Sequence, residues 1–190
     1  MTIVYASIAP HGAELIPKLA KPRERRFSRT REGMRTLAGR IATVKPDTIL
    51  IASPHNLRLV ENIAVIVTEN STGVLRTSPK RMVSLKAKCN VELARELLQR
   101  AKGLSLPVVG ANYGSFNGST SDIPMDWGTL VPLWFVLHEK RVRARIVLVA
   151  PSREIPIDLN VKFGAALAGL LQTFLRRVVL AGDNPGAQSF

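Results

Sequence analysis

Two histidines stand at the ends of two β-rich apolar segments. His11 closes residues 2–11, TIVYASIAPH, and His55 closes residues 48–55, TILIASPH. Ligands of open α/β sheets bind just beyond the carboxyl ends of the strands, so both imidazoles would reach one edge of the sheet. Imidazole is the commonest protein metal ligand. The pattern favours a mononuclear metal site, and the alternative is a pair of strand-end histidines bonded only to backbone.

The chemistry of such a site depends on what joins the two imidazoles. Two histidines and one carboxylate on one face of Fe(II) form the typical site of a non-haem iron oxygenase. The opposite positions then stay open for a catechol and O₂. In this interpretation His11 and His55 are the first two metal ligands.

Strand-like and helix-like segments alternate along the chain. This order predicts an α/β fold in a single domain over residues 1–190, with a central, mostly parallel or mixed sheet and helices on both faces. The predicted strands cover residues 3–8, 48–52, 107–111, 145–149 and a last strand from 177, with a hairpin formed by 62–68 and 74–76. The predicted helices cover residues 30–43, 91–101, 129–138 and 158–175, and 18–29 is an exposed basic loop.

The composition and the single cysteine predict where in the cell the protein is located. No apolar run approaches the roughly 20 residues that span a bilayer, so no membrane partner is expected. No secretory signal is visible at the N-terminus. The single cysteine, Cys89, cannot form an internal disulfide. A reduced, cytoplasmic location is therefore the expectation.

The formal net charge of +13 needs an explanation, and much of the excess lies in residues 18–40. A basic patch of this kind is typical of nucleic-acid or anion binding, and also of a merely solvated helix face. Base-stacking aromatic residues are almost absent there, since Phe27 stands alone. We therefore expect the chain to have no nucleic-acid partner.

Three motifs carry a resemblance to a known family: SIAPHG at 7–12, PDTILIASPH at 46–55 and PMDWGTLVPL at 124–133. The chain resembles the class III extradiol ring-cleavage dioxygenases, of the type of the catalytic B subunit of protocatechuate 4,5-dioxygenase. The resemblance implies the α/β fold of these dioxygenases, with non-haem iron held by His11 and His55. It also implies an oxidoreductase of aromatic compound catabolism, which uses O₂ to cleave a small catecholic substrate next to its two hydroxyls.

Asn56, Asp126 and Trp127 are the candidates for the substrate pocket. Asn56 could donate to bound O₂ or substrate, or serve the turn after the strand. Asp126 could orient a ligand or cap the following helix. Trp127 is either a core residue or a pocket wall. It stands where many relatives carry a histidine, and an indole cannot shuttle a proton.

The end of the chain departs from the family. Relatives take their third ligand, a glutamate, and their acid/base histidine from the C-terminal part, whereas residues 183–190 contain no histidine. One interpretation is a domain truncated or altered after about 182, whose missing acidic part would explain some of the positive charge. In the other, Asp183 substitutes as the third ligand because it follows a strand at the same edge, or Glu14 does.

These departures leave two functions open and no catalytic acid or base assigned. The first is the Fe(II)-dependent extradiol dioxygenase. The second is an impaired or non-oxygenase relative that binds zinc or acts as a scaffold. A homo-oligomer is compatible with both.

Overall fold

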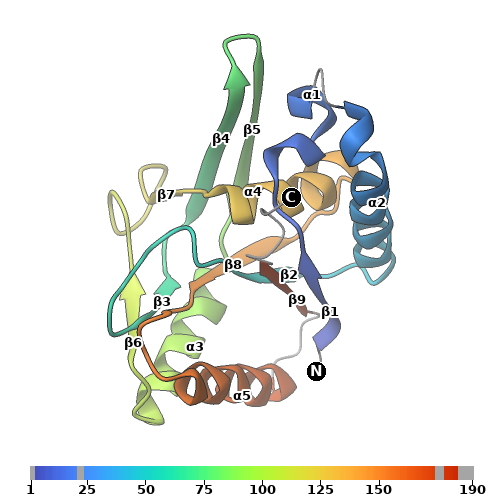
Figure 1. Ribbon diagram of the computed structural model, residues 1–190. Helices are drawn as coiled ribbons and strands as arrows, with labels where there is room; N and C mark the ends of the chain where they lie inside the picture. The colour runs from blue at the N-terminus through green and yellow to red at the C-terminus, as the bar shows by residue number, and fades with distance from the viewer. Residues whose placement is uncertain (1–2, 21–23, 174–177, 184–190) are drawn as a thin grey trace.

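The computed structural model describes residues 3–20, 24–173 and 178–183, and a six-stranded sheet in the order β1-β9-β2-β8-β3-β6 forms its centre (Figure 1). Its strands are β1 (Ile3–Ala9), β2 (Thr48–Ala52), β3 (Ile63–Ile66), β6 (Val108–Ala111), β8 (Arg145–Ala150) and β9 (Val178–Asp183). Strand β3 runs antiparallel to β8, and the other neighbours are parallel. The predicted α/β class with a mixed sheet is confirmed.

Helices cover both faces of the sheet, and each face has its own apolar core (Figure 1). Because side chains alternate along β2, Ile49 and Ile51 pack into one core and Leu50 into the other. This is the continuous apolar run expected of a central parallel strand. The helices on the first face are α2 (Ser28–Thr43), α4 (Trp127–Leu133) and the π-helix η3 (Trp134–Glu139). Those on the second face are α3 (Val91–Gly103) and α5 (Ile157–Thr173).

Helix α3 shows how local sequence specifies an element. The Asn90 side chain accepts a hydrogen bond from the Leu93 amide at 3.2 Å, which caps the helix as its sequence predicts. Leu93, Ala94, Leu97 and Ala101 form its buried stripe. The last predicted helix, 158–175, is described to residue 173 as α5. Its buried residues are Phe163, Ala166, Leu167, Leu170 and Leu171.

The predicted basic loop at 18–29 is partly wrong. Helix α1 (Pro17–Ala20) and two short 3₁₀ turns, η1 (Ala13–Leu15) and η2 (Glu24–Phe27), lie in or beside it. Leu19 and Ala20 are each 2% exposed. Burial of these two side chains, rather than the surrounding charge, orders this part of the chain. Helix α2 also begins at Ser28, two residues before the predicted start.

The predicted hairpin of 62–68 with 74–76 is wrong. Residues 63–66 form β3 inside the main sheet, where all four are buried. The hairpin consists of β4 (Asn70–Ser78) and β5 (Arg81–Lys88), and β7 (Asp122–Pro124) pairs with β4 in a second sheet. A Cβ at Gly73 would lie 2.7 Å from the Leu130 side chain, so glycine is needed where β4 crosses α4.

The helix predicted at 129–138 begins earlier, at Trp127, and Pro132 lies inside it rather than in its first turn. Proline has no backbone N–H to donate to the preceding turn. The π-helical turns of η3 follow directly after this point. Among the helices of the described residues, none has both the length and the apolar character to cross a membrane.

Candidate metal centre

The order of the strands brings three chain positions to one edge of the sheet. Strand β9 lies between β1 and β2 and is parallel to both. Its last residue, Asp183, pairs with Ala9, two positions before His11. Gly182 pairs with Ala52, three positions before His55. Two histidine-bearing strand ends therefore flank the end of β9.

The two imidazole rings meet at this edge. The ring centroids of His11 and His55 are 5.0 Å apart, and the ring planes are inclined by 50°. Two imidazoles that bind one ion through bonds of about 2 Å have ring centres on the order of 5 Å apart. His11 is 0% exposed, and His55 is partly buried. The separation of the rings and the chemistry of the donors thus fit a shared metal ion.

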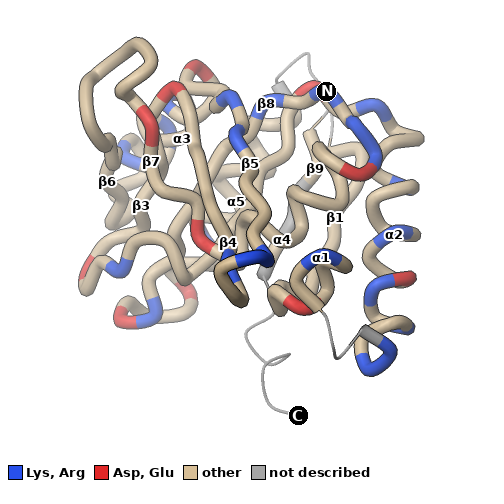
Figure 2. The backbone as a smooth tube through the Cα atoms, turned by 90° about the horizontal axis from the view of Figure 1, so that it is seen from above, with Lys and Arg blue, Asp and Glu red and all other residues tan. Residues whose placement is uncertain are grey.

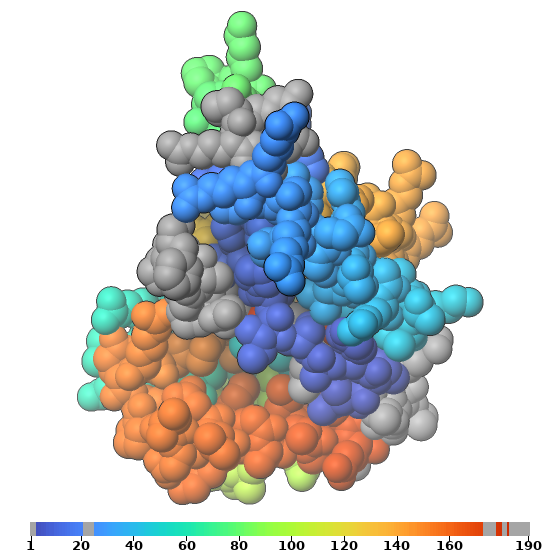
Figure 3. Space-filling view, turned by 45° about the vertical axis from the view of Figure 1, so that its right-hand side comes forward, coloured from blue at the N-terminus to red at the C-terminus, as the bar shows by residue number. Residues whose placement is uncertain are grey.

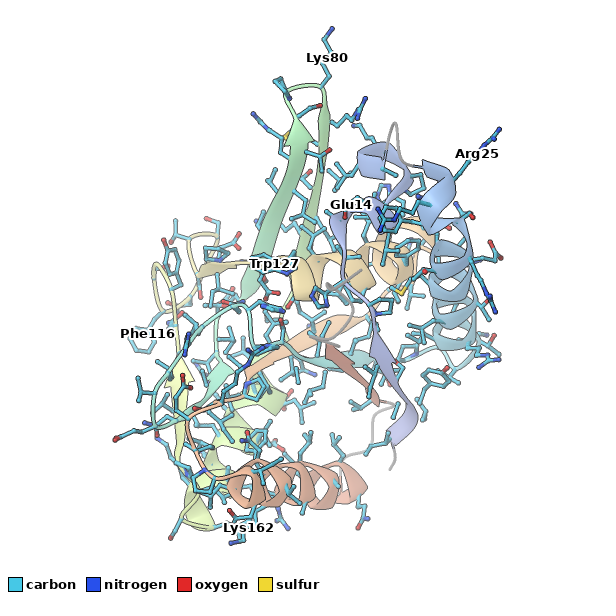
Figure 4. The ribbon with its side chains drawn as sticks, in the orientation of Figure 1. Glu14, Arg25, Lys80, Phe116, Trp127 and Lys162 are labelled. Atoms are coloured by element: carbon cyan, nitrogen blue, oxygen red, sulfur yellow. The ribbon has the colours of Figure 1, made fainter. Side chains whose placement is uncertain are left out.

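A third protein ligand is the weaker part of the site. Among the side chains that the structure describes, no group of three or more His, Cys, Asp or Glu is placed to hold a metal ion. Asp183 is described through its backbone pairing alone, at the end of β9. Glu14 lies in η1, and a Cβ at Gly12 would be 3.6 Å from its Oε2 atom. Figure 4 shows Glu14 above the main sheet, near α4.

A buried arginine holds the turn that follows His11. Arg31 on α2 is 5% exposed, and its Nε donates to the Leu15 carbonyl at 2.7 Å. Its Nη2 donates to the Glu14 carbonyl at 3.0 Å. Sequence analysis missed this residue inside the basic segment. The available signal was its helical spacing from Met34, Ala38 and Ile41, which are the apolar residues on the buried side of α2.

A carboxylate links the turn at His55 to helix α4. Asp126 accepts hydrogen bonds from the Ser53 hydroxyl at 2.9 Å, the Thr129 amide at 2.9 Å and the Thr129 hydroxyl at 2.8 Å. The Ser53 hydroxyl in turn accepts from the His55 amide at 3.4 Å. Asp126 therefore caps α4, as one of its two interpretations predicts, and Ser53 is a positioning residue that the sequence analysis missed.

The other two pocket candidates, Trp127 and Asn56, are neighbours of His55 in space and in sequence, respectively. The Trp127 ring is 4.8 Å from the His55 ring, at an angle of 31°, and the residue is 40% exposed. The Asn56 side-chain amide donates to the Pro124 carbonyl at 3.2 Å, which supports the turn interpretation. A role of either residue toward substrate stays a prediction.

A cavity of about 180 Å³ opens beside His55, between the segments that follow β2 and β8. Across it Arg58 forms an ion pair with Glu154, with Nη2 to Oε1 at 2.6 Å. The hydrogen bond from Arg58 holds the pKa of the Glu154 carboxyl below its usual range. The Ser152 hydroxyl donates to the Leu59 carbonyl at 2.9 Å and so ties the two segments together. His55 is therefore one of the residues that line this cavity.

Cys89 is expected to resist alkylation until the protein unfolds. The thiol is buried, and burial raises its pKa to about 12. Because a thiolate is the nucleophile, iodoacetamide at pH 8 should label the folded protein at least about a hundredfold more slowly than the urea-unfolded protein, as mass spectrometry would measure. Equal labelling rates in the two states would contradict the burial of this thiol.

Comparison with known proteins adds two findings. Residues 5–184 match the family model described as the catalytic LigB subunit of aromatic ring-opening dioxygenase. Protein CA_C1420 of Clostridium acetobutylicum is 26% identical over 129 residues, which are 68% of this chain and 28% of that protein. The chain thus spans less than a third of the length of that relative.

Proposed function

The chain belongs to the family of the catalytic LigB subunit of aromatic ring-opening dioxygenase, and on this premise we propose that it cleaves a catecholic ring with O₂ in an Fe(II)-dependent extradiol reaction. The observation that supports the proposal most is the 5.0 Å separation of the His11 and His55 rings. When bound, Fe(II) supplies a redox-active centre with open positions on one face for the substrate and O₂.

Each residue of the site has a proposed role. His11 and His55 hold the ion through their imidazole nitrogens. Asp183 supplies the third, anionic ligand, because its strand ends between the two histidine-bearing strands. Buried Arg31 and the pair Ser53–Asp126 orient the two turns that carry the imidazoles.

Trp127 shapes the approach to this site. Its ring lies 4.8 Å from the His55 ring, and 40% of the residue is exposed. An aromatic face of this kind stacks favourably on a planar ring. The indole offers an N–H donor and no titratable group, so Trp127 excludes water from this side but holds no proton for the reaction.

Oxygen consumption tests the proposed activity. The metal-free protein is loaded with Fe(II) without oxygen, mixed with a panel of catechols and then exposed to air. We expect uptake of one O₂ per catechol and the absorbance of a ring-opened product, with no uptake by zinc-loaded protein. Tight iron binding without oxygen uptake for any catechol would contradict the proposal.

A second candidate function is a zinc-binding or scaffold protein of the same family. It is favoured by Trp127, which cannot transfer a proton. Retention of zinc through purification, together with the absence of oxygen uptake after iron loading, would support this alternative.

Trp127 fluorescence is expected to report metal binding directly. The chain has two tryptophans, so Trp134→Phe leaves Trp127 as the single indole, 4.8 Å from the His55 ring. A paramagnetic ion such as Co²⁺ bound beside His55 should quench more than about half of this emission. The variant Trp127→Phe, which keeps Trp134, serves as the control. Quenching that survives His55→Ala in the Trp134→Phe background would place the ion elsewhere.

A further inference from the structure

The hairpin of β4 and β5 presents one apolar, buried face and one exposed face that carries cations. Val83, Leu85 and Ala87 are at most 9% exposed and pack into the core below the hairpin. The side chains that alternate with them are exposed, and they are Met82, Ser84, Lys86 and Lys88. The end of the hairpin projects from the body of the protein, as the green residues at the top of Figure 3 show.

The charge on this hairpin has one sign. Between Asn70 and Val91 the sequence contains five cationic residues and no aspartate or glutamate. We call these five residues the hairpin cations; they are Arg76, Lys80, Arg81, Lys86 and Lys88. In the described part of the chain, the ion pair found for them joins Lys86 to Asp122 at 3.4 Å. Like charges gathered in this way repel one another, so they do not stabilise the fold.

A second group of cations lies next to the hairpin. The Thr77 hydroxyl on β4 donates to the Leu19 carbonyl of α1 at 3.2 Å, which fixes the hairpin beside the segment that leads into α2. Lys18, Arg25 and Arg29 are exposed on that segment. Figure 2 shows basic residues on the hairpin, on α1 and along α2, and in Figure 4 Lys80 and Arg25 both point away from the body.

We propose that the hairpin cations form a docking surface for double-stranded nucleic acid, which they contact through its phosphates and without regard to sequence. A duplex carries about one negative charge per 1.7 Å of its axis, which complements a row of cations. Lys86 and Lys88 stand two residues apart on one strand, which separates them by about 7 Å along the ribbon. Contacts of lysine and arginine with phosphates position a protein on a duplex but do not specify a sequence.

The composition of the hairpin favours a nucleic-acid duplex over a single strand and over a membrane. The face carries no aromatic residue on which bases of a single strand could stack. The exposed large apolar side chains of the hairpin are Val74 and Met82. The turn between the strands, Pro79–Lys80, has no aromatic or large apolar side chain to enter a bilayer. This proposal departs from the expectation that the chain has no nucleic-acid partner. That expectation rested on the lack of stacking aromatic residues in residues 18–40, and contacts with duplex phosphates need no stacking.

Fluorescence anisotropy with a labelled, mixed-sequence DNA duplex of 20 base pairs tests the proposal across a series of salt concentrations. One variant combines Arg76→Gln, Lys80→Gln and Lys88→Gln. The matched control combines Arg95→Gln, Lys102→Gln and Lys162→Gln, which lowers the net charge equally with exposed residues of α3 and α5. Figure 4 shows Lys162 at the opposite end of the molecule from Lys80.

We expect the hairpin variant to bind the duplex at least about tenfold more weakly at 0.1 M salt, and its salt slope to fall by roughly 2 to 3, near 0.9 for each lost contact. The control should stay within about twofold of the natural protein. Equal losses in both variants would overturn the proposal, because net charge alone would then explain binding. So would tighter binding to single strands, to phosphatidylserine vesicles or to polyglutamate than to the duplex, or no binding to the duplex at all.

Discussion

His55→Ala is expected to abolish stoichiometric iron binding. The variant removes one of two imidazoles whose ring centroids are 5.0 Å apart, and the remaining His11 cannot hold the ion alone. Loss of a direct ligand should weaken binding by more than the 10- to 100-fold typical of residues that only orient a ligand. Iron content after anaerobic loading and desalting measures the effect.

The third histidine of the chain provides the control. His138 is exposed and lies against Trp134, with ring centroids 5.1 Å apart. His138→Ala removes an imidazole of the same chemistry and should keep the full iron content. His11→Ala should behave as His55→Ala does. If His55→Ala retains one iron per chain, the paired-imidazole site is wrong, whatever the activity of the protein.

Asp126→Ala is expected to weaken both the fold and the metal site. The substitution removes the acceptor for the Thr129 amide, a helix cap worth about 1 kcal/mol. It also leaves the buried Ser53 hydroxyl without the carboxylate, which costs roughly another 1 kcal/mol. Because Ser53 contacts the His55 amide, metal affinity should fall by about tenfold. Urea unfolding measures the first effect, and metal titration measures the second.

The variant Asp126→Asn tests whether stability and metal binding need the negative charge of Asp126 or only its hydrogen bonds. The asparagine keeps a side-chain oxygen that can accept from Thr129 and Ser53, and asparagine is itself a good helix cap. We expect the free energy of unfolding and the metal affinity of this variant to be close to those of the natural protein. If Asp126→Ala binds metal with unchanged affinity, the link from α4 to His55 does not position the imidazole.

Several parts of the fold could be predicted because local sequence specifies them. The limits of β2 follow from a short β-branched run, and the start of α3 follows from Asn90. The errors occurred where distant contacts decide the outcome. Residues 63–66 were assigned to a hairpin because an apolar run and a nearby turn signal fit one equally well. The burial of Arg31, inside the basic segment 18–40, depends on carbonyl partners from the segment after β1.

The sequence by itself determined that two strands of an α/β sheet are each followed, within three residues, by a histidine. Strand periodicity and composition are local properties, so they can be recognised without the tertiary structure. Tertiary structure alone decided which strand lies between the two strands that precede His11 and His55. Strand β9 inserts in parallel between β1 and β2, through pairings that span more than 125 positions of the chain. No local periodicity encodes such a pairing, since a parallel partner is chosen by the packing of both faces of the whole sheet. That choice brings His11 and His55 together with the end of β9 between their strands.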